Sequence, residues 1–268
     1  RGRRQRDEQA NETSLPGYLG CMSAMPADPV GDQSEPQAPH VTSEPGAPDE
    51  PRIGELSEGE VLRRILQRLG EASSALVGPG DDAAVIAAPD GRVVVTTDTL
   101  VHGPDFRLAW SSPFDIGWKA AAVNLADVAA MGARPTGLVV ALAVPTHLPV
   151  SFVEGLADGR RAACDALSPG CTVVGGDLTS SDTLTIAVTA FGSLDGVEPV
   201  LRSGARPGDL LAIAGTLGSA ARGLEVLFER GVDAAGQPIP LDTAALSKAD
   251  ADALAIQLRP APPLAAGI

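Results

Sequence analysis

The sequence predicts a mixed α/β fold, closer to the α+β type than to a pure βαβ series. Apolar residues recur at helical spacing in segments 57–70, 112–132 and 151–167. Short apolar runs bounded by turn residues lie between these segments. Two such runs, 171–178 and 183–194, follow one another with no helix between them, which favours a sheet with some adjacent strands over strictly alternating βαβ units.

Composition narrows the classes of function. The 268 residues carry a formal net charge of −14, and only 3% of them are aromatic. A broad nucleic-acid footprint needs clustered cations or stacking aromatic rings, so we expect no nucleic-acid partner. The chain contains neither an apolar stretch of about 20 residues nor a signal-like N-terminus. We therefore expect no membrane association and a cytoplasmic location.

The chain divides into three parts by composition. Residues 1–52 are rich in Pro, Gly and acidic residues and lack any helical or strand period, so they are predicted to be a disordered extension. Residues 53–198 contain the first set of periodic segments. From residue 199 onward, the stretch "VLRSGARPGDLLAIAG" and the amphipathic segment 219–231 indicate the start of a second domain.

The first ordered elements have clear end signals. Ser57 and Glu60 form a capping-box pattern for the helix 57–70. Runs 83–88 and 92–100 are predicted to be strands, and the turn residues between them predict a hairpin.

The second helix, 112–132, has Ser112 as its cap and Asp115 at the third position. It is followed by the predicted strand 136–145, the helix 151–167 and the two strands named above. Together these elements describe an ordinary α+β domain.

Several mechanisms lack the necessary residues. The chain has three histidines, two lysines and no glycine-rich Walker loop. By contrast, aspartates recur beside small residues at predicted strand ends, in "GDDAA", "TTDT", "NLADVAAMG" and "GGDLTS". Oxygen ligands of this kind suit Mg²⁺, which prefers a few carboxylates together with substrate phosphates. Taken one at a time, each of these aspartates is also compatible with an ordinary turn.

Two residue types allow alternative interpretations. Asp127 lies among apolar residues on its helix, which suggests a buried carboxylate that needs a metal partner. The alternative is an exposed stripe shared with Asn124, three residues earlier. Arg202 and Arg206 suit a phosphate clamp, but they equally suit a solvated loop.

In order, the strings "GDDAAV", "TTDTLV", "KAAAVNLADVAAMGARP", "GGDLT", "RSGARPGDLLAIAGTLGSAARGL" and "LRPAPP" resemble the thiamine-monophosphate kinase family, within the superfamily of aminoimidazole ribonucleotide synthetase. The resemblance runs from about residue 53 to the end. It implies that 53–198 is an N-terminal domain that binds Mg-ATP and dimerises through its sheet, and that 199–268 begins an α/β C-terminal domain.

The resemblance implies ATP-dependent phosphorylation of thiamine monophosphate to thiamine diphosphate. No covalent enzyme intermediate or catalytic side chain is implied, since positioning and metal charge carry the reaction. The implied residues fall into three groups. The implied Mg²⁺ ligands are Asp82, Thr96, Thr97, Asp98, Asp127 and Asp177. The implied contacts to ATP are Gly176, Asp177 and Arg202, and the position that meets the substrate is Asp105.

This chain departs from the family pattern in two ways. Many members have a histidine where Asp105 stands, with His102 three residues away. Members also continue into segments with further metal and thiamine ligands, whereas this chain ends at Ile268, so we expect a C-terminally truncated family member. The alternatives are another ATP-dependent synthetase of the superfamily or a non-catalytic dimerising fragment.

Overall fold

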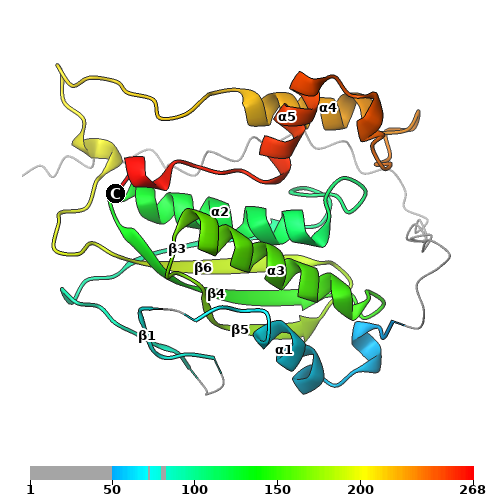
Figure 1. Ribbon diagram of the computed structural model, residues 1–268, viewed down its shortest axis with the longest axis horizontal. Coiled ribbons are helices and arrows are strands. Elements are labelled where there is room, and N and C mark those ends of the chain that lie inside the picture. Colours follow the sequence, from blue (N-terminus) through cyan, green and yellow to red (C-terminus); the bar gives the residue numbers. More distant parts are fainter. Residues whose placement is uncertain (1–49, 72, 80–82) are drawn as a thin grey trace, which may run out of the picture. The chain divides into compact units, whose positions relative to one another are not determined.

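The computed structural model describes residues 50–71, 73–79 and 83–268 (Figure 1). The predicted extension 1–52 lies outside these residues, apart from its last three. The expectation that it is disordered therefore stays a prediction, as do the domain boundaries at 53–198 and 199–268.

A four-stranded sheet forms the centre of the fold. Its strands are β3 (Val94–Val101), β4 (Arg134–Val144), β5 (Val173–Ser180) and β6 (Thr185–Ser193), arranged in the order β3-β6-β4-β5. β6 runs antiparallel to both neighbours, whereas β4 and β5 are parallel and are connected by a helix. The predicted mixed α/β architecture is confirmed, because the sheet combines one parallel pair with two antiparallel pairs.

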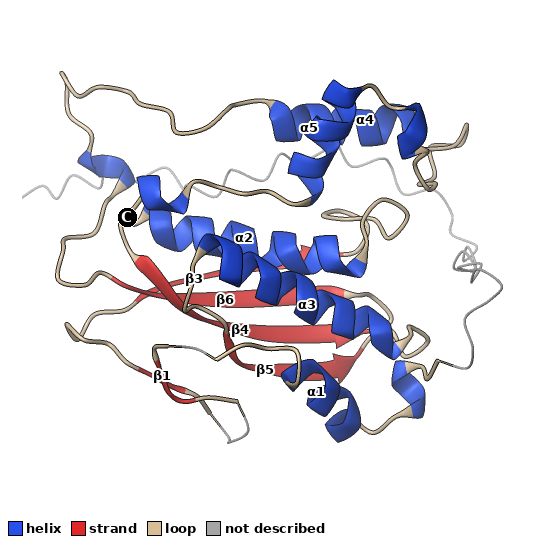
Figure 2. Ribbon diagram, in the orientation of Figure 1, coloured by secondary structure: helices blue, strands red, loops and turns tan. Residues whose placement is uncertain are grey.

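Two long helices cover one face of this sheet (Figure 2). α2 (Pro113–Ala130) is capped by Ser112, whose hydroxyl accepts a hydrogen bond from the Asp115 N–H at 3.2 Å. The Asp115 carboxylate accepts one in return from the Ser112 N–H at 3.1 Å, so the predicted cap is confirmed. The second helix, α3 (Val150–Leu167), connects β4 to β5.

Glycines let α2 and α3 approach each other closely. A Cβ added at Gly117 of α2 would overlap the carbonyl oxygen of Leu156, and one at Gly159 of α3 would overlap that of Phe114. The two backbones are therefore nearly in contact, which fixes how α2 lies above the sheet.

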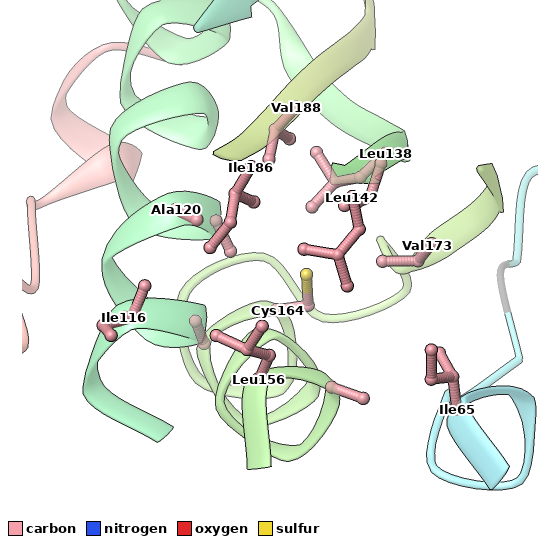
Figure 3. Close-up of a cluster of buried hydrophobic side chains, with 14 of the residues drawn as sticks. Ile65, Ile116, Ala120, Leu138, Leu142, Leu156, Cys164, Val173, Ile186 and Val188 are labelled. Atoms are coloured by element: carbon pink, nitrogen blue, oxygen red, sulfur yellow. The ribbon is translucent and has the colours of Figure 1, made fainter. Parts of the chain in front are cut away.

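Between these helices and the sheet lies the apolar core (Figure 3). Leu138 and Leu142 of β4 and Ile186 of β6 meet Leu156 and Cys164 of α3, and all five are at most 4% exposed. Successive side chains on a strand point to opposite faces. The strand neighbours of these core residues therefore point to the face of the sheet that α2 and α3 do not cover.

The N-terminal elements lie near β5. The predicted first helix is confirmed as α1 (Glu58–Leu66), and Ser57 donates through its hydroxyl to Glu60 at 2.6 Å. The helix is shorter than expected, ending at Leu66.

The predicted hairpin of 83–88 with 92–100 is wrong. β2 (Val85–Ile86) pairs instead with β1 (Ala75–Val77), and β3 pairs along its full length with β6. The reason lies in the turn. The Asp90 carboxylate accepts hydrogen bonds from Arg92 at 2.8 Å and from the Gly196 N–H at 3.2 Å, which directs the turn toward the loop after β6.

The C-terminal part contains α4 (Ser219–Arg230), as predicted, and α5 (Lys248–Leu258), which was not predicted. Short 3-10 helices complete the fold at Ile53–Glu55, Arg202–Gly204, Thr243–Ala245 and Leu264–Ala266. α4 is tied to the segment before α2, because the Trp110 indole N–H donates to the carbonyl of Gly231 at 2.6 Å.

Among the described residues, no helix combines the length and the apolar character that crossing a bilayer would require.

Candidate functional site

The strongest concentration of predicted site residues lies where β3 passes under α2. Thr96 and Asp98, two apart on β3, point to the α2 face. The Thr96 hydroxyl lies 3.5 Å from a carboxylate oxygen of Asp127, which α2 supplies from its last two turns. A strand and a helix from different parts of the chain therefore bring three predicted metal ligands to one place.

The electrostatics of this group are unfavourable in the absence of a cation. Although Asp98 is exposed, partial burial of its carboxyl raises its pKa, and the charges of Asp127 and Asp105 raise it further. Neighbouring carboxylates that disfavour one another's ionisation are a common arrangement at cation sites.

The expectation that Asp127 is buried is wrong. Asp127 is exposed, whereas Asn124 is 1% exposed and donates its side-chain N–H to the carbonyl of Ala120 at 2.9 Å. The alternative of a shared exposed stripe is therefore wrong as well. The boundary between the buried and the exposed side of α2 lies between Asn124 and Asp127. Helical spacing alone does not say where this boundary falls.

Asp105 has a local structural contact. One of its carboxylate oxygens accepts a hydrogen bond from the Val101 N–H at 2.8 Å, closing the turn after β3. His102 packs its ring against Phe106, with centroids 5.7 Å apart. These contacts account for both side chains within the loop, and a role of Asp105 toward the substrate stays a prediction.

Thr97 points to the other face of the sheet. Its hydroxyl donates to the carbonyl of Val188 at 3.0 Å and accepts from the Thr189 hydroxyl at 3.3 Å. Both contacts join β3 to β6, so the side chain of Thr97 is engaged in the sheet. If Thr97 binds a metal ion, the ligand atom would therefore be its backbone carbonyl oxygen.

Gly176 and Asp177 lie on β5, at the edge of the sheet opposite to β3. The register runs from Asp98 through Val188 and Val140 to Gly176, which is three strand spacings, or about 14 Å. Asp177, one residue further on, points to the face opposite Asp98. The structure thus does not bring Asp177 together with Asp98 and Asp127.

The remaining predicted residues are not part of either group. Arg202 is exposed in a 3-10 helix, and Asp82 lies outside the described residues. Within the described ranges, no three His, Cys, Asp or Glu side chains are grouped closely enough to enclose a metal ion. The donor set at β3 and α2 is therefore open: it offers a hydroxyl and two carboxylates, which fits a hard cation that completes its shell with water or phosphate oxygens.

A cavity of about 840 Å³ borders Gly176 and Asp177. α1, β2 and β5 form much of its wall, which is largely apolar and includes Leu62, Ile65 and Val173. This cavity could not be predicted from the sequence, since its walls come from segments more than one hundred residues apart.

Comparison with known proteins identifies the class to which this fold and this site belong. Residues 80–194 match the family described as AIR synthase related protein, N-terminal domain. Two relatives show high similarity. The thiamine-monophosphate kinase of Corynebacterium glutamicum is 48% identical over 188 residues, and that of Mycobacterium tuberculosis is 45% identical over 177 residues. The chain belongs to the thiamine-monophosphate kinase family within the AIR synthase-related superfamily.

The matches cover 69% and 66% of this chain but 55% and 53% of those two relatives, so the chain spans about half their length. Solved structures agree. Thiamine monophosphate kinase of Aquifex aeolicus has a TM-score of 0.57 at 29% identity, covering 80% of this chain and 63% of that one. AaThiL complexed with AMPPCP and TMP has a TM-score of 0.56 at 28% identity, covering 81% and 63%.

Proposed function

We propose that this protein transfers the γ-phosphoryl group of ATP to the phosphate of thiamine monophosphate, which forms thiamine diphosphate and ADP. The observation that carries the proposal is the meeting of Thr96 and Asp98 of β3 with Asp127 of α2. Membership of the thiamine-monophosphate kinase family supplies the identity of the reaction.

Thr96, Asp98 and Asp127 would hold Mg²⁺ through oxygen atoms. Such an ion would supply positive charge that offsets the negative charge of the nucleotide phosphates. The chain's own contribution is positional: β3 and α2 hold the carboxylates at a fixed separation before the nucleotide arrives, so little reorganisation accompanies binding. The acceptor phosphate oxygen would bond to the γ-phosphorus as the bond to the bridging oxygen of ADP breaks.

The other metal and nucleotide ligands are proposed because they lie in the sequence motifs that resemble the family. Asp82, Thr97 and Asp177 are proposed further metal ligands, and Gly176 and Arg202 are proposed nucleotide contacts. The absence of a Cβ at Gly176 is needed for the packing of β5 against β4, because an added Cβ would overlap the Val140 carbonyl oxygen. We also propose that 53–198 is the nucleotide-binding domain and that 199–268 begins a second domain.

A homodimer is proposed from the sheet face opposite α2 and α3. Val95 of β3 points to this face and is 60% exposed, and Val93 just before the strand is 53% exposed. Covering these exposed apolar side chains with a second copy would remove them from water. Light scattering at micromolar concentration tests this: a dimer mass is expected, and a monomer mass would contradict it.

The proposed reaction is tested by incubating the full-length protein with Mg-ATP and thiamine monophosphate and separating the products by chromatography. We expect thiamine diphosphate, and we expect Asp98→Asn to lower its formation by about 100-fold or more, because a charged metal ligand is lost. Asp165→Asn is the matched control, since Asp165 is an exposed carboxylate of α3 paired with Arg161. Equal turnover by Asp98→Asn and the control would rule out this metal site.

A further inference from the structure

Arg160 of α3 is a buried cation without a counter-ion. It is 2% exposed, and its Nε and Nη1 atoms have no hydrogen-bond partner within the described part of the chain. Burial lowers its pKa to about 10, an effect that the thiol of Cys164 partly offsets, so the guanidinium stays charged at neutral pH. Buried charges in proteins are ordinarily paired, because an isolated one loses its hydration without compensation.

The adjacent arginine behaves differently. Arg161 is exposed and forms an ion pair with Asp165, one turn further along α3, at 2.9 Å. The two neighbouring arginines therefore differ in what surrounds them: Arg161 is satisfied at the surface, whereas Arg160 is turned inward and lacks a carboxylate partner among the described residues.

Arg160 lines the cavity beside β5 described above. Leu62, Ile65 and Leu66 of α1 form an apolar wall of this cavity, and Gly175 and Gly176 of β5 also line it. Its volume, about 840 Å³, lies within the range of small-molecule sites, which combine apolar walls with a few fixed polar groups.

We propose that this cavity binds a small organic anion, whose carboxylate or phosphate pairs with Arg160 and whose apolar body packs against α1 and β5. A guanidinium N–H without a partner can donate a charge-assisted hydrogen bond to an oxyanion. The inference goes beyond the proposed kinase reaction and does not depend on it, since it involves neither Asp98 nor Asp127. The site adjoins Gly176 and Asp177, so its occupant would lie next to the proposed nucleotide contacts.

The test is a calorimetric titration of the full chain without Mg²⁺ or nucleotide. The probes are phenyl phosphate and benzoate, with benzyl alcohol as the neutral match. At least one anion is expected to bind saturably, and benzyl alcohol to bind about tenfold more weakly or worse. The anion that binds more tightly identifies the headgroup as phosphate or carboxylate.

Arg160→Met, which keeps an unbranched apolar side chain, is expected to weaken the anion by about tenfold or more and to leave benzyl alcohol unchanged. Arg161→Met is the control and should bind like the wild type. Without ligand, Arg160→Met should have a higher Tm than the wild type, because an unpaired buried charge has been removed.

An independent measurement needs no variant. In the wild-type chain, the NMR resonance of the Arg160 Nε–H should shift and saturate along the titration with the anion. The proposal is overturned if neither anion binds saturably at millimolar concentration, if wild type and Arg160→Met bind the anions equally, or if the Nε–H resonance does not respond.

Discussion

The guanidinium of Arg259 forms an ion pair with the carboxylate of Asp115, although the two residues are 144 positions apart. Arg259 follows α5, and Asp115 lies in the first turn of α2. The same guanidinium stacks on the ring of Phe114 at 4.8 Å, and the indole N–H of Trp118 donates to the carbonyl of Pro260 at 2.7 Å. The C-terminal segment is thereby attached to the start of the central helix.

Removing this ion pair should loosen the C-terminal segment. Arg259→Ala is expected to lower the free energy of unfolding by about 1–2 kcal/mol, because Asp115 is buried but the arginine is half exposed to solvent. Hydrogen exchange of the Trp118 indole N–H should quicken in the variant. Arg161→Ala, which removes an exposed pair, should cost about 0.5 kcal/mol or less. Equal effects of the two substitutions would show that the Arg259 contact contributes nothing special.

Stability should fall in acid partly because of Asp115. Burial by itself would raise the pKa of Asp115, but hydrogen bonds from Ser112 and Arg259 outweigh it and lower the pKa below the ordinary value of 3.8. A carboxyl with a lowered pKa in the folded state stabilises the protein fully above its unfolded pKa. That contribution disappears as the pH falls through the folded pKa.

Urea unfolding of wild type and Asp115→Asn measures this contribution. The difference between them should be constant above about pH 5 and should shrink as the pH drops below about 3.9. A difference that grows on acidification would mean that the pKa is shifted in the opposite direction.

The contact between α2 and α3 should not tolerate a methyl group. Gly159→Ala would force a Cβ into the carbonyl oxygen of Phe114, and the backbones would have to separate. We expect a loss of about 1–3 kcal/mol in the free energy of unfolding. The control is Gly59→Ala in α1, where nothing lies within 4 Å of the added atom. This control should be neutral or stabilising by up to about 1 kcal/mol, and a neutral Gly159→Ala would contradict the close packing.

Asp98→Asn should stabilise the chain when no divalent cation is present. Partial burial and the charges of Asp127 and Asp105 raise the pKa of Asp98, so its ionised form is disfavoured in the folded state near neutral pH. Neutralising it should raise the free energy of unfolding by about 0.5 kcal/mol, the scale of exposed charge pairs.

Added Mg²⁺ should then raise the Tm of the wild type but not that of the Asp98→Asn variant. Thermal unfolding with and without Mg²⁺ measures both effects, and an identical response of the two proteins would count against Asp98 as a ligand.

Short-range signals were sufficient for α1 to α4 and for most strands, whereas α5 and β1 were not predicted. The capping boxes at Ser57 and Ser112 depend on residues three positions apart, so they could be predicted without the rest of the fold. The order of the acidic blocks was likewise sufficient to indicate the family. By contrast, the period of two in β3 shows that it is a strand but does not say which strand it pairs with.

The sequence by itself therefore determined the helix caps, the mixed fold class and the candidate ligands. The tertiary structure decided three further features: the pairing of β3 with β6 instead of β2, the exposure of Asp127, and the inward position of Arg160. The physical reason is the same in each case. Strand partners, burial and ion pairing depend on residues that are distant in the chain, and local propensity carries no information about which distant segments meet.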